Sequence, residues 1–202
     1  MTTLLPLVFT SGWASGVNAY ATVLLLGLIG RIGSVDAVPA GLQRTDVLIA
    51  AAILYVVEFV ADKIPYVDST WDAISTLIRP TAGAVIGALL AGSVPEDTSL
   101  DQIVLASVGG GTALVSHLTK AGIRLAVNTS PEPVTNIGIS LLEDVAVLGL
   151  VAFAVQHPRA AAAIAGALLA IGLVLLFFIA RLVRRGWRRW KGRRASPAGA
   201  GP

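Results

Sequence analysis

The chain has 202 residues, of which 55% are hydrophobic and 13% are charged, and its mean hydropathy is +0.78. Soluble domains carry about a quarter charged residues, so this composition argues against a soluble enzyme, a nucleic-acid-binding protein and a disordered chain. The absence of cysteine excludes disulfides, thiolate metal sites and thiol nucleophiles. We therefore predict a small all-α integral membrane protein that crosses the bilayer several times.

The formal net charge of +3 combines two unequal parts of the chain. From Arg181 onward there are eight basic residues and no acidic residue, whereas the preceding part has seven basic and twelve acidic residues. A basic segment behind an apolar run is typical of a cytoplasmic end that is held at anionic lipid headgroups. Trp187 and Trp190 suit a membrane interface, so we expect this segment to contact lipid and not nucleic acid.

Six apolar segments are candidates for the spans of about 20 residues that a bilayer requires. They lie at about 4–32, with an interruption at Ser11-Gly12-Trp13, and at 47–64, 81–92, 103–127, 134–156 and 159–183. Six crossings would place both termini on the same side of the membrane. The basic segment indicates that this side is the cytoplasm, at a bacterial inner membrane. The polar connector 93–101, which contains three acids and no base, would then face the outside.

The third segment is too short to cross alone. Its twelve residues, 81–92, would form a helix of about 18 Å, whereas the apolar core is about 30 Å thick. Pro80 precedes it and lacks the N–H that a helix interior uses. We therefore expect a broken or re-entrant element over about residues 66–93.

The connector divides the chain into two halves of three helices, 1–92 and 102–183, followed by a basic tail, 184–202, whose end we expect to be disordered. The second helix of each half carries an acidic pair, Glu58/Asp62 and Glu143/Asp144. A duplicated unit with three spans inserts in the opposite sense, as in inverted-repeat transporters. We expect such a repeat, and a homodimer, because one copy makes a thin bundle.

Ionisable residues inside the predicted spans are the main candidates for a functional site, because each costs at least about 2.5–3.5 kcal/mol to insert. Glu58 and Asp62 share one helix face, and Asp68, Asp72 and Arg79 share another. The residues that we expect to line a path for an ion or substrate are Asn18, Glu58, Asp62, Lys63, Asp68, Asp72, Arg79, His117, Lys120, Arg124, Glu132, Asn136, Ser140, Glu143 and Asp144.

Most common enzyme signatures are absent from the sequence. It contains no Gly-x-Ser-x-Gly elbow, no His-Glu-x-x-His and no phosphate-binding glycine loop. His117 is the one histidine in the polar clusters, which excludes a multi-histidine metal site. No cofactor is evident, although Glu58, Asp62, Asp68 and Asp72 could supply oxygen ligands to a hard divalent cation.

Groups of polar residues form spaced motifs along the chain. They are Glu58-x-x-x-Asp62-Lys63-x-Pro65-x-x-Asp68-x-x-x-Asp72, Ile78-Arg79-Pro80, Ser116-His117-x-x-Lys120-x-x-x-Arg124, and Ser130-Pro131-Glu132-Pro133 with Ser140-x-x-Glu143-Asp144. The motifs resemble those of a domain-of-unknown-function family of small bacterial integral membrane proteins, over about residues 10–180. The resemblance implies a helical membrane protein and assigns no activity. The basic tail lies outside it.

The leading functional hypothesis is a small transporter or channel for an ion or small charged solute, with its site where the two halves meet and with proton coupling through Glu58 or Glu143. It requires the acidic pairs to face a common cavity near mid-depth. An enzyme acting on a lipid or phosphorylated headgroup would gather its acids at one leaflet. A structural subunit would have every charge paired and no cavity.

Overall fold

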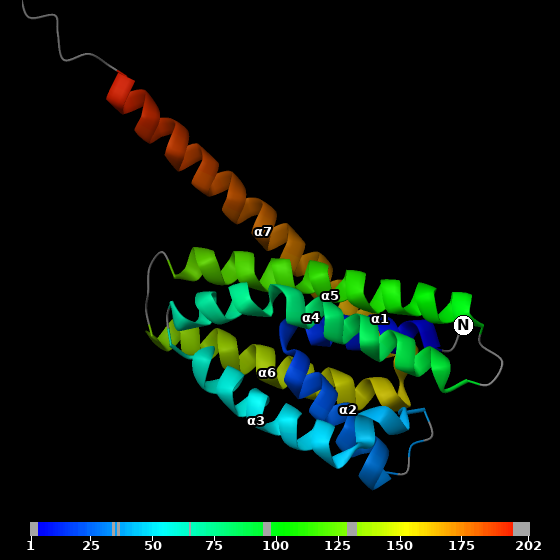
Figure 1. Cartoon of the computed structure of the whole chain (residues 1–202). Helices are drawn as coiled ribbons and strands as arrows, with labels where there is room; N and C mark the ends of the chain where they lie inside the picture. The colour runs from blue at the N-terminus through cyan, green and yellow to red at the C-terminus, as the bar shows by residue number, and fades with distance from the viewer. Residues whose placement is uncertain are drawn as a thin grey trace, which may run out of the picture.

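The computed structural model describes residues 4–33, 35, 37–64, 66–94, 98–128 and 133–195, and of Pro133, Gly186 and 188–195 it describes the backbone alone. All regular secondary structure in this part of the chain is helical, without a strand (Figure 1). The elements are α1 Leu4–Val17, α2 Ala19–Gly33, the 3-10 turn η1 Ala40–Gln43, α3 Thr45–Ala61, α4 Val67–Gly92, α5 Ser99–Val127, α6 Pro133–Gln156 and α7 Pro158–Ala195. The prediction of an all-α fold is confirmed.

The bundle has an apolar outer surface and many polar residues in its interior. On α3, for example, Ile49, Ile53 and Val56 are all more than half exposed, whereas Glu58 on the same helix is fully buried. A protein in water has the opposite distribution, and a membrane protein turns ionisable side chains toward the bundle interior. Among the described residues, three helices are long and apolar enough to cross a bilayer, over Val67–Gly92, Val134–Gln156 and Pro158–Arg185. The chain is therefore a helical membrane protein.

The first apolar segment does not form a single crossing, and the prediction for it is wrong. α1 and α2 contain 14 and 15 residues, about 21 and 22 Å of helix, and the chain turns between them at Asn18. The Asn18 Oδ1 atom accepts a 2.9 Å hydrogen bond from the Ala21 N–H. This side chain caps the start of α2, so a polar residue and not the glycine-containing Ser11-Gly12-Trp13 marks the break.

α1 and α2 form a helical hairpin whose two outer ends lie at the same end of the bundle (Figure 1). α1 ends where the Lys120 Nζ atom donates to the Val17 carbonyl oxygen, and Lys120 also binds Asp62 at the end of α3. α2 then returns toward the start of α3, where Arg31 Nη1 donates to Thr45 Oγ1 at 2.9 Å. The N-terminal end of α1 and the C-terminal end of α7 lie toward opposite ends of the bundle, unlike the two ends of a six-span chain.

α4 is one continuous helix, which corrects the prediction of a broken or re-entrant element over 66–93. It contains 26 residues and includes Pro80, so its length of about 39 Å exceeds the apolar core. Neighbouring helices and hydroxyl side chains allow proline inside membrane helices. Ser15 Oγ of α1 donates a 3.0 Å hydrogen bond to the carbonyl oxygen of Arg79, immediately before the proline.

Glycine residues bring α1, α4 and α5 into close contact. A Cβ atom on Gly109 of α5 would lie 2.3 Å from the Gly83 carbonyl oxygen of α4, and one on Gly87 would lie 2.3 Å from the Leu105 carbonyl oxygen. On α1, a Cβ on Gly16 would lie 2.3 Å from the Ala113 carbonyl oxygen. Small residues at membrane-helix interfaces permit such backbone approach, and this packing fixes the hairpin against α4 and α5.

The last helix, α7, extends away from the other helices at its C-terminal end (Figure 1). Only 6% of its most apolar 18-residue stretch is buried inside the structure. Phe177 and Phe178 are more than half exposed. With 38 residues it is about 57 Å long. The sixth predicted segment, 159–183, is helical as expected, but the helix continues through the basic segment to Ala195.

Candidate functional site: a buried ion-pair network

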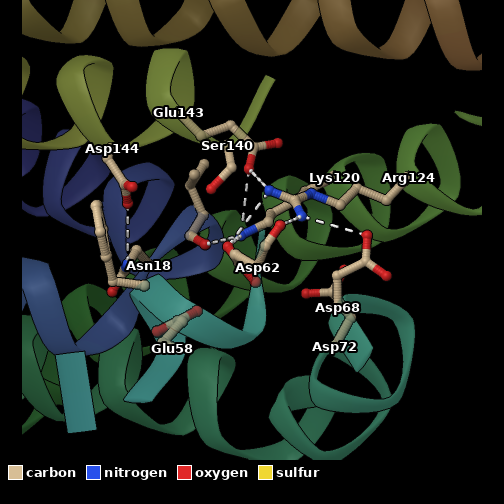
Figure 2. A network of polar contacts seen from close by, with 12 residues as sticks. Asn18, Glu58, Asp62, Asp68, Asp72, Lys120, Arg124, Ser140, Glu143 and Asp144 are labelled. Carbon is tan, nitrogen blue, oxygen red and sulfur yellow. Dashed lines mark hydrogen bonds and ion pairs between the residues drawn. The ribbon is translucent and has the colours of Figure 1, made fainter. Parts of the chain in front are cut away.

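Charged side chains from α3, α4, α5 and α6 meet in the interior of the bundle, beside the tip of the α1–α2 hairpin. Figure 2 shows Lys120 and Arg124 of α5, Asp62 after α3 and Glu143 of α6 pointing toward one another. The i, i+4 spacing of Lys120 and Arg124 puts both on one face of α5, and both are buried. The network therefore links elements from both halves of the sequence.

The centre of the network is formed by Lys120 and Arg124 with two carboxylates. Lys120 Nζ lies 2.7 Å from Asp62 Oδ2 and 3.4 Å from Glu143 Oε2. Arg124 Nη2 lies 2.5 Å from Glu143 Oε2, and its Nη1 donates to the Asp62 backbone carbonyl oxygen at 2.7 Å. Arg124 also reaches Asp68 Oδ2 at 3.4 Å. Charge-assisted bonds of this kind are the strong ones, so this group holds α3, α5 and α6 together.

Arg79 forms a second group, halfway along α4. Its Nη2 atom donates to Glu58 Oε1 at 2.5 Å, and its Nη1 atom donates to His117 Nδ1 at 2.9 Å. The same Nη1 atom lies 2.9 Å from Asp72 Oδ1, but this contact lacks hydrogen-bond geometry, because neither Asp72 oxygen has a hydrogen-bond partner among the described residues. All four side chains are 2% exposed or less. Two carboxylates thus share one guanidinium group.

The hydrogen bonds of His117 fix its tautomer. A guanidinium group can only donate, so His117 Nδ1 must accept from Arg79. Its Nε2 atom lies 3.0 Å from Thr76 Oγ1, and the Thr76 hydroxyl donates to the Asp72 backbone carbonyl oxygen. Nε2 must therefore carry the proton and donate to Thr76. His117 is neutral in this arrangement and adds no charge to the network.

A third group joins Lys63 to α6 and to the hairpin tip. Lys63 Nζ donates to Ser140 Oγ at 3.2 Å and to Asp144 Oδ2 at 3.3 Å, and it lies 3.1 Å from the ring centroid of Phe59. The other oxygen of Asp144 accepts a 3.5 Å hydrogen bond from Asn18 Nδ2. Asn18 thus both caps α2 and connects the hairpin to this ion pair.

Backbone carbonyl groups at the end of α1 also belong to the network. The Val17 carbonyl oxygen accepts from Lys120 Nζ at 2.9 Å, and the Gly16 carbonyl oxygen lies 3.5 Å from Arg79 Nη1. The last carbonyls of a helix lack intrahelical partners and carry partial negative charge. Two buried cations of the network therefore stabilise a helix that ends inside the molecule.

A pocket of about 260 Å³, open to the outside of the bundle, adjoins the network between α1, α5, α6 and α7. Lys120 and Glu143 line it, together with the hydroxyl-bearing Ser116 and Thr119. The rest of its wall is largely apolar and is formed by Trp13, Val17, Ile123, Ile139, Leu142, Ala146, Leu168, Leu169 and Gly172. The Glu143 side chain is 20% exposed, so this carboxylate connects the ion pairs to the pocket.

The structure brings together nearly all of the residues that the sequence singles out. Those that are buried and in contact with the network are Asn18, Glu58, Asp62, Asp68, Asp72, Arg79, His117, Lys120, Arg124, Asn136, Ser140 and Asp144, with Lys63 and Glu143 partly buried. Glu132 lies outside the described residues. The network therefore follows the polar helix faces that the spacing predicts.

The predicted divalent-cation site is not supported by this arrangement. Among the described residues, no group of three or more histidine or acidic side chains is placed to hold a metal ion. Glu58 and Asp72 face Arg79, whereas Asp62 and Asp68 face Arg124. Each carboxylate is thus already beside a basic side chain.

Two side chains of the network were not predicted as site residues. Thr76 lies four residues after Asp72 and three before Arg79, so helical periodicity could have identified it. Asn128, after the end of α5, donates from Nδ2 to Asp68 Oδ1 at 2.9 Å and to Ser69 Oγ at 2.8 Å. The Gly16 and Val17 carbonyls have no signal in the sequence, because every residue carries a carbonyl.

The comparisons with known proteins identify a family and no activity. A family model described as a domain of unknown function, DUF4126, matches residues 5–178. No curated protein and no solved structure matches the chain. The family match covers well over half of the sequence and includes every residue of the network, in agreement with the resemblance of the motifs. The chain therefore belongs to the DUF4126 family.

Proposed function

We propose that this protein is a small membrane transporter or channel for an ion or small charged solute, with its site at the ion-pair network between the two halves. The observation that carries the proposal is that the buried network reaches an open pocket of about 260 Å³ through Lys120 and Glu143. Ionisable side chains inside a membrane typically mark ion and substrate pathways. A purely structural network needs no such opening.

Ion pairs across the two halves are the second support for transport. Asp62 of the first half binds Lys120 and Arg124 of the second, and Lys63 of the first binds Asp144 of the second. Breaking such a buried ion pair is unfavourable unless each of its charged side chains finds a new partner in the second conformation. In our proposal the halves 1–92 and 102–183 move relative to each other by exchanging these pairs, and their relation as an inverted repeat remains a prediction.

The distribution of polar and apolar groups along the bundle favours a path that is open toward one end. Polar residues extend from Arg79, halfway along α4, to Asp68 in its first turn and to Asn128 beyond α5. Toward the other end, the backbones of α4 and α5 are in contact at Gly83 and Gly109. We infer a half-path from one membrane surface to the hairpin tip, closed beyond it by helix packing.

The hairpin changes the proposed topology. With α1 and α2 entering and leaving at the same end, five helices cross the membrane, α3 to α7. If the basic end of α7 is cytoplasmic, the α3–α4 and α5–α6 loops are cytoplasmic as well. The N-terminus and the α4–α5 connector then face the outside. The half-path therefore opens toward the cytoplasm.

Flux measurements in proteoliposomes test the proposal. We expect the wild-type protein to carry protons, small cations or small anions above the rate of empty liposomes, with a dependence on pH. Glu143→Gln should keep helical content and elution volume but lose flux, because an amide neither titrates nor carries charge. Asp46→Asn is the matched control, since Asp46 forms an exposed ion pair with Arg44 outside the network. No flux of any tested ion through the wild-type protein would contradict transport.

A further inference from the structure

The buried network contains more acids than bases. Its carboxylates among the described residues are Glu58, Asp62, Asp68, Asp72, Glu143 and Asp144, and its basic side chains are Lys63, Arg79, Lys120 and Arg124. His117 is neutral through its hydrogen bonds. If every carboxyl group were ionised, the network would carry two uncompensated negative charges. Burying net charge is so unfavourable that a group usually becomes neutral instead.

The local contacts locate the excess of acid at Arg79. Lys63 faces Asp144 alone, and Lys120 and Arg124 share Asp62 and Glu143. The additional acid near Arg124 is Asp68, which lies in the first turn of α4 and accepts from Asn128, where the helix dipole favours a negative charge. Arg79, deep in the bundle, faces both Glu58 and Asp72.

The hydrogen bonds around Arg79 distinguish its two carboxyl groups. Glu58 Oε1 receives a hydrogen bond from Arg79, whereas Asp72 receives none, because the two hydrogens of the Nη1 atom nearest to it are donated to His117 Nδ1 and to the Gly16 carbonyl oxygen. Glu58 Oε2 and both Asp72 oxygens have no hydrogen-bond partner among the described residues. A buried ionised oxygen without a donor loses its hydration without replacement. A protonated carboxyl group at Asp72 lowers that cost, because burying a neutral polar group is less unfavourable than burying a charge.

Other charged groups nearby do not supply the missing positive charge. Besides Arg79, the charges that act on Glu58 are those of Lys120 and Asp62, and the phenols of Tyr20 on α2 and Tyr55 on α3 are also within its electrostatic reach. Besides Arg79, the charges that act on Asp72 are those of Lys120, Arg124 and Asp62. Lys120 and Arg124 both bind Asp62 directly, so their charge is already shared with a closer carboxylate.

We propose that the Glu58–Asp72 pair binds one proton at neutral pH and that Asp72 carries it. This inference deepens the proposed function, because it names the binding site of the coupled proton in a proton-dependent transporter. The proton enters from and returns to water along the polar side chains that lead to Asp68. Neutral Asp72 beside ionised Glu58 leaves Arg79 with a single counterion, as Lys63 has with Asp144.

Infrared spectroscopy of the full-length protein in lipid tests the site without any flux measurement. We expect the carbonyl stretching band of a protonated carboxyl group in the wild-type protein at neutral pH. The band should shift when aspartate carboxyl groups are labelled with carbon-13 and remain in place when glutamate is labelled. A spectrum without this band overturns the proposal, and a band that moves with glutamate labelling overturns the assignment to Asp72.

Two isosteric variants provide an independent readout of stability. Asp72→Asn replaces a carboxyl group that is already neutral, so its thermal unfolding midpoint should match or exceed that of the wild type, and the infrared band should disappear. Asp144→Asn, the matched control, removes the ionised partner of Lys63 and should lower the midpoint. A midpoint for Asp72→Asn as low as that of Asp144→Asn would overturn the proposal.

Two further outcomes separate this site from its alternatives. If the pair holds a metal cation such as Na⁺ instead of a proton, the band is absent and the unfolding midpoint rises with Na⁺ at constant pH, which overturns the proposal. A band together with an absence of flux supports the proton site and contradicts transport. Flux without the band supports transport and contradicts the site.

Discussion

The Lys120 ammonium group donates a 2.9 Å hydrogen bond to the carbonyl oxygen of Val17, the last residue of α1. A helix that ends inside a membrane protein needs partners for its final carbonyls, and here the partner comes from the other half of the chain. The same ammonium group binds Asp62 at 2.7 Å. One buried cation thus completes the hairpin and joins it to the ion-pair network.

Replacement of Lys120 should therefore destabilise both the end of α1 and the ion-pair network. Lys120→Met leaves Asp62 without its closest cation, and breaking a buried pair costs about 3–5 kcal/mol. Adding Asp62→Asn should recover only part of this loss, because the Val17 carbonyl still lacks its donor. The measurement is the thermal unfolding midpoint in detergent. Complete recovery in the double variant would show that the contact with Val17 contributes nothing.

Single cysteines in this cysteine-free chain distinguish the hairpin from a single first crossing. Leu5 in the first turn of α1 and Ser99 at the start of α5 lie at the same end of the bundle, whereas Tyr66 lies at the other. We expect cysteines at Leu5 and Ser99 to react with an impermeant thiol reagent added to intact cells. A cysteine at Tyr66 should react only after the cells are lysed. Six crossings predict that Leu5 behaves like Tyr66.

The sequence was sufficient to predict which side chains would be buried together. Helical spacing puts Glu58 beside Asp62 and Lys120 beside Arg124, and the low tolerance of membranes for charge requires them to face inward. It was not sufficient to pair them. Lys63 follows Asp62 in the chain, yet it binds Asp144, because the chain turns after α3 and directs consecutive side chains to different helices.

The hairpin could not be derived from the apolar pattern. Residues 4–33 form an almost uninterrupted apolar run, which satisfies the length of one span as well as that of two half-helices. The turn depends on Asn18, whose side chain caps α2 and binds Asp144 on a distant helix. Similarly, Pro80 predicts a helix end by local rules, but contacts from α1 and α3 hold α4 continuous.

Close glycine packing predicts a large difference between two alanine substitutions. Gly87→Ala places a methyl group 2.3 Å from the Leu105 carbonyl oxygen, whereas Gly111, on the same pair of helices, has nothing within 4 Å of its Cβ position. Gly87→Ala should cost about 1–3 kcal/mol through overpacking. Gly111→Ala should be neutral or stabilise by about 0.5–1 kcal/mol, because glycine weakens helices. Equal midpoints in thermal unfolding would contradict the close approach of α4 and α5.

The ion pair between Lys63 and Asp144 permits a test of how the two halves are joined. Lys63→Met leaves the largely buried Asp144 carboxylate without its cation, and Asp144→Asn leaves Lys63 without its counterion, although Ser140 and the Phe59 carbonyl still accept from it. Each single change should destabilise the protein, by less than the about 3–5 kcal/mol typical of fully buried pairs, because the Lys63 side chain is 18% exposed. The double variant should be more stable than the sum of the single changes predicts, since it removes both charges.

Lys63→Met with Asp62→Asn is the matched control, because Asp62 precedes Lys63 in sequence but binds Lys120 and Arg124. If this control recovers stability and the Asp144 combination does not, Lys63 pairs with its neighbour in the chain and the two halves are not linked at this position.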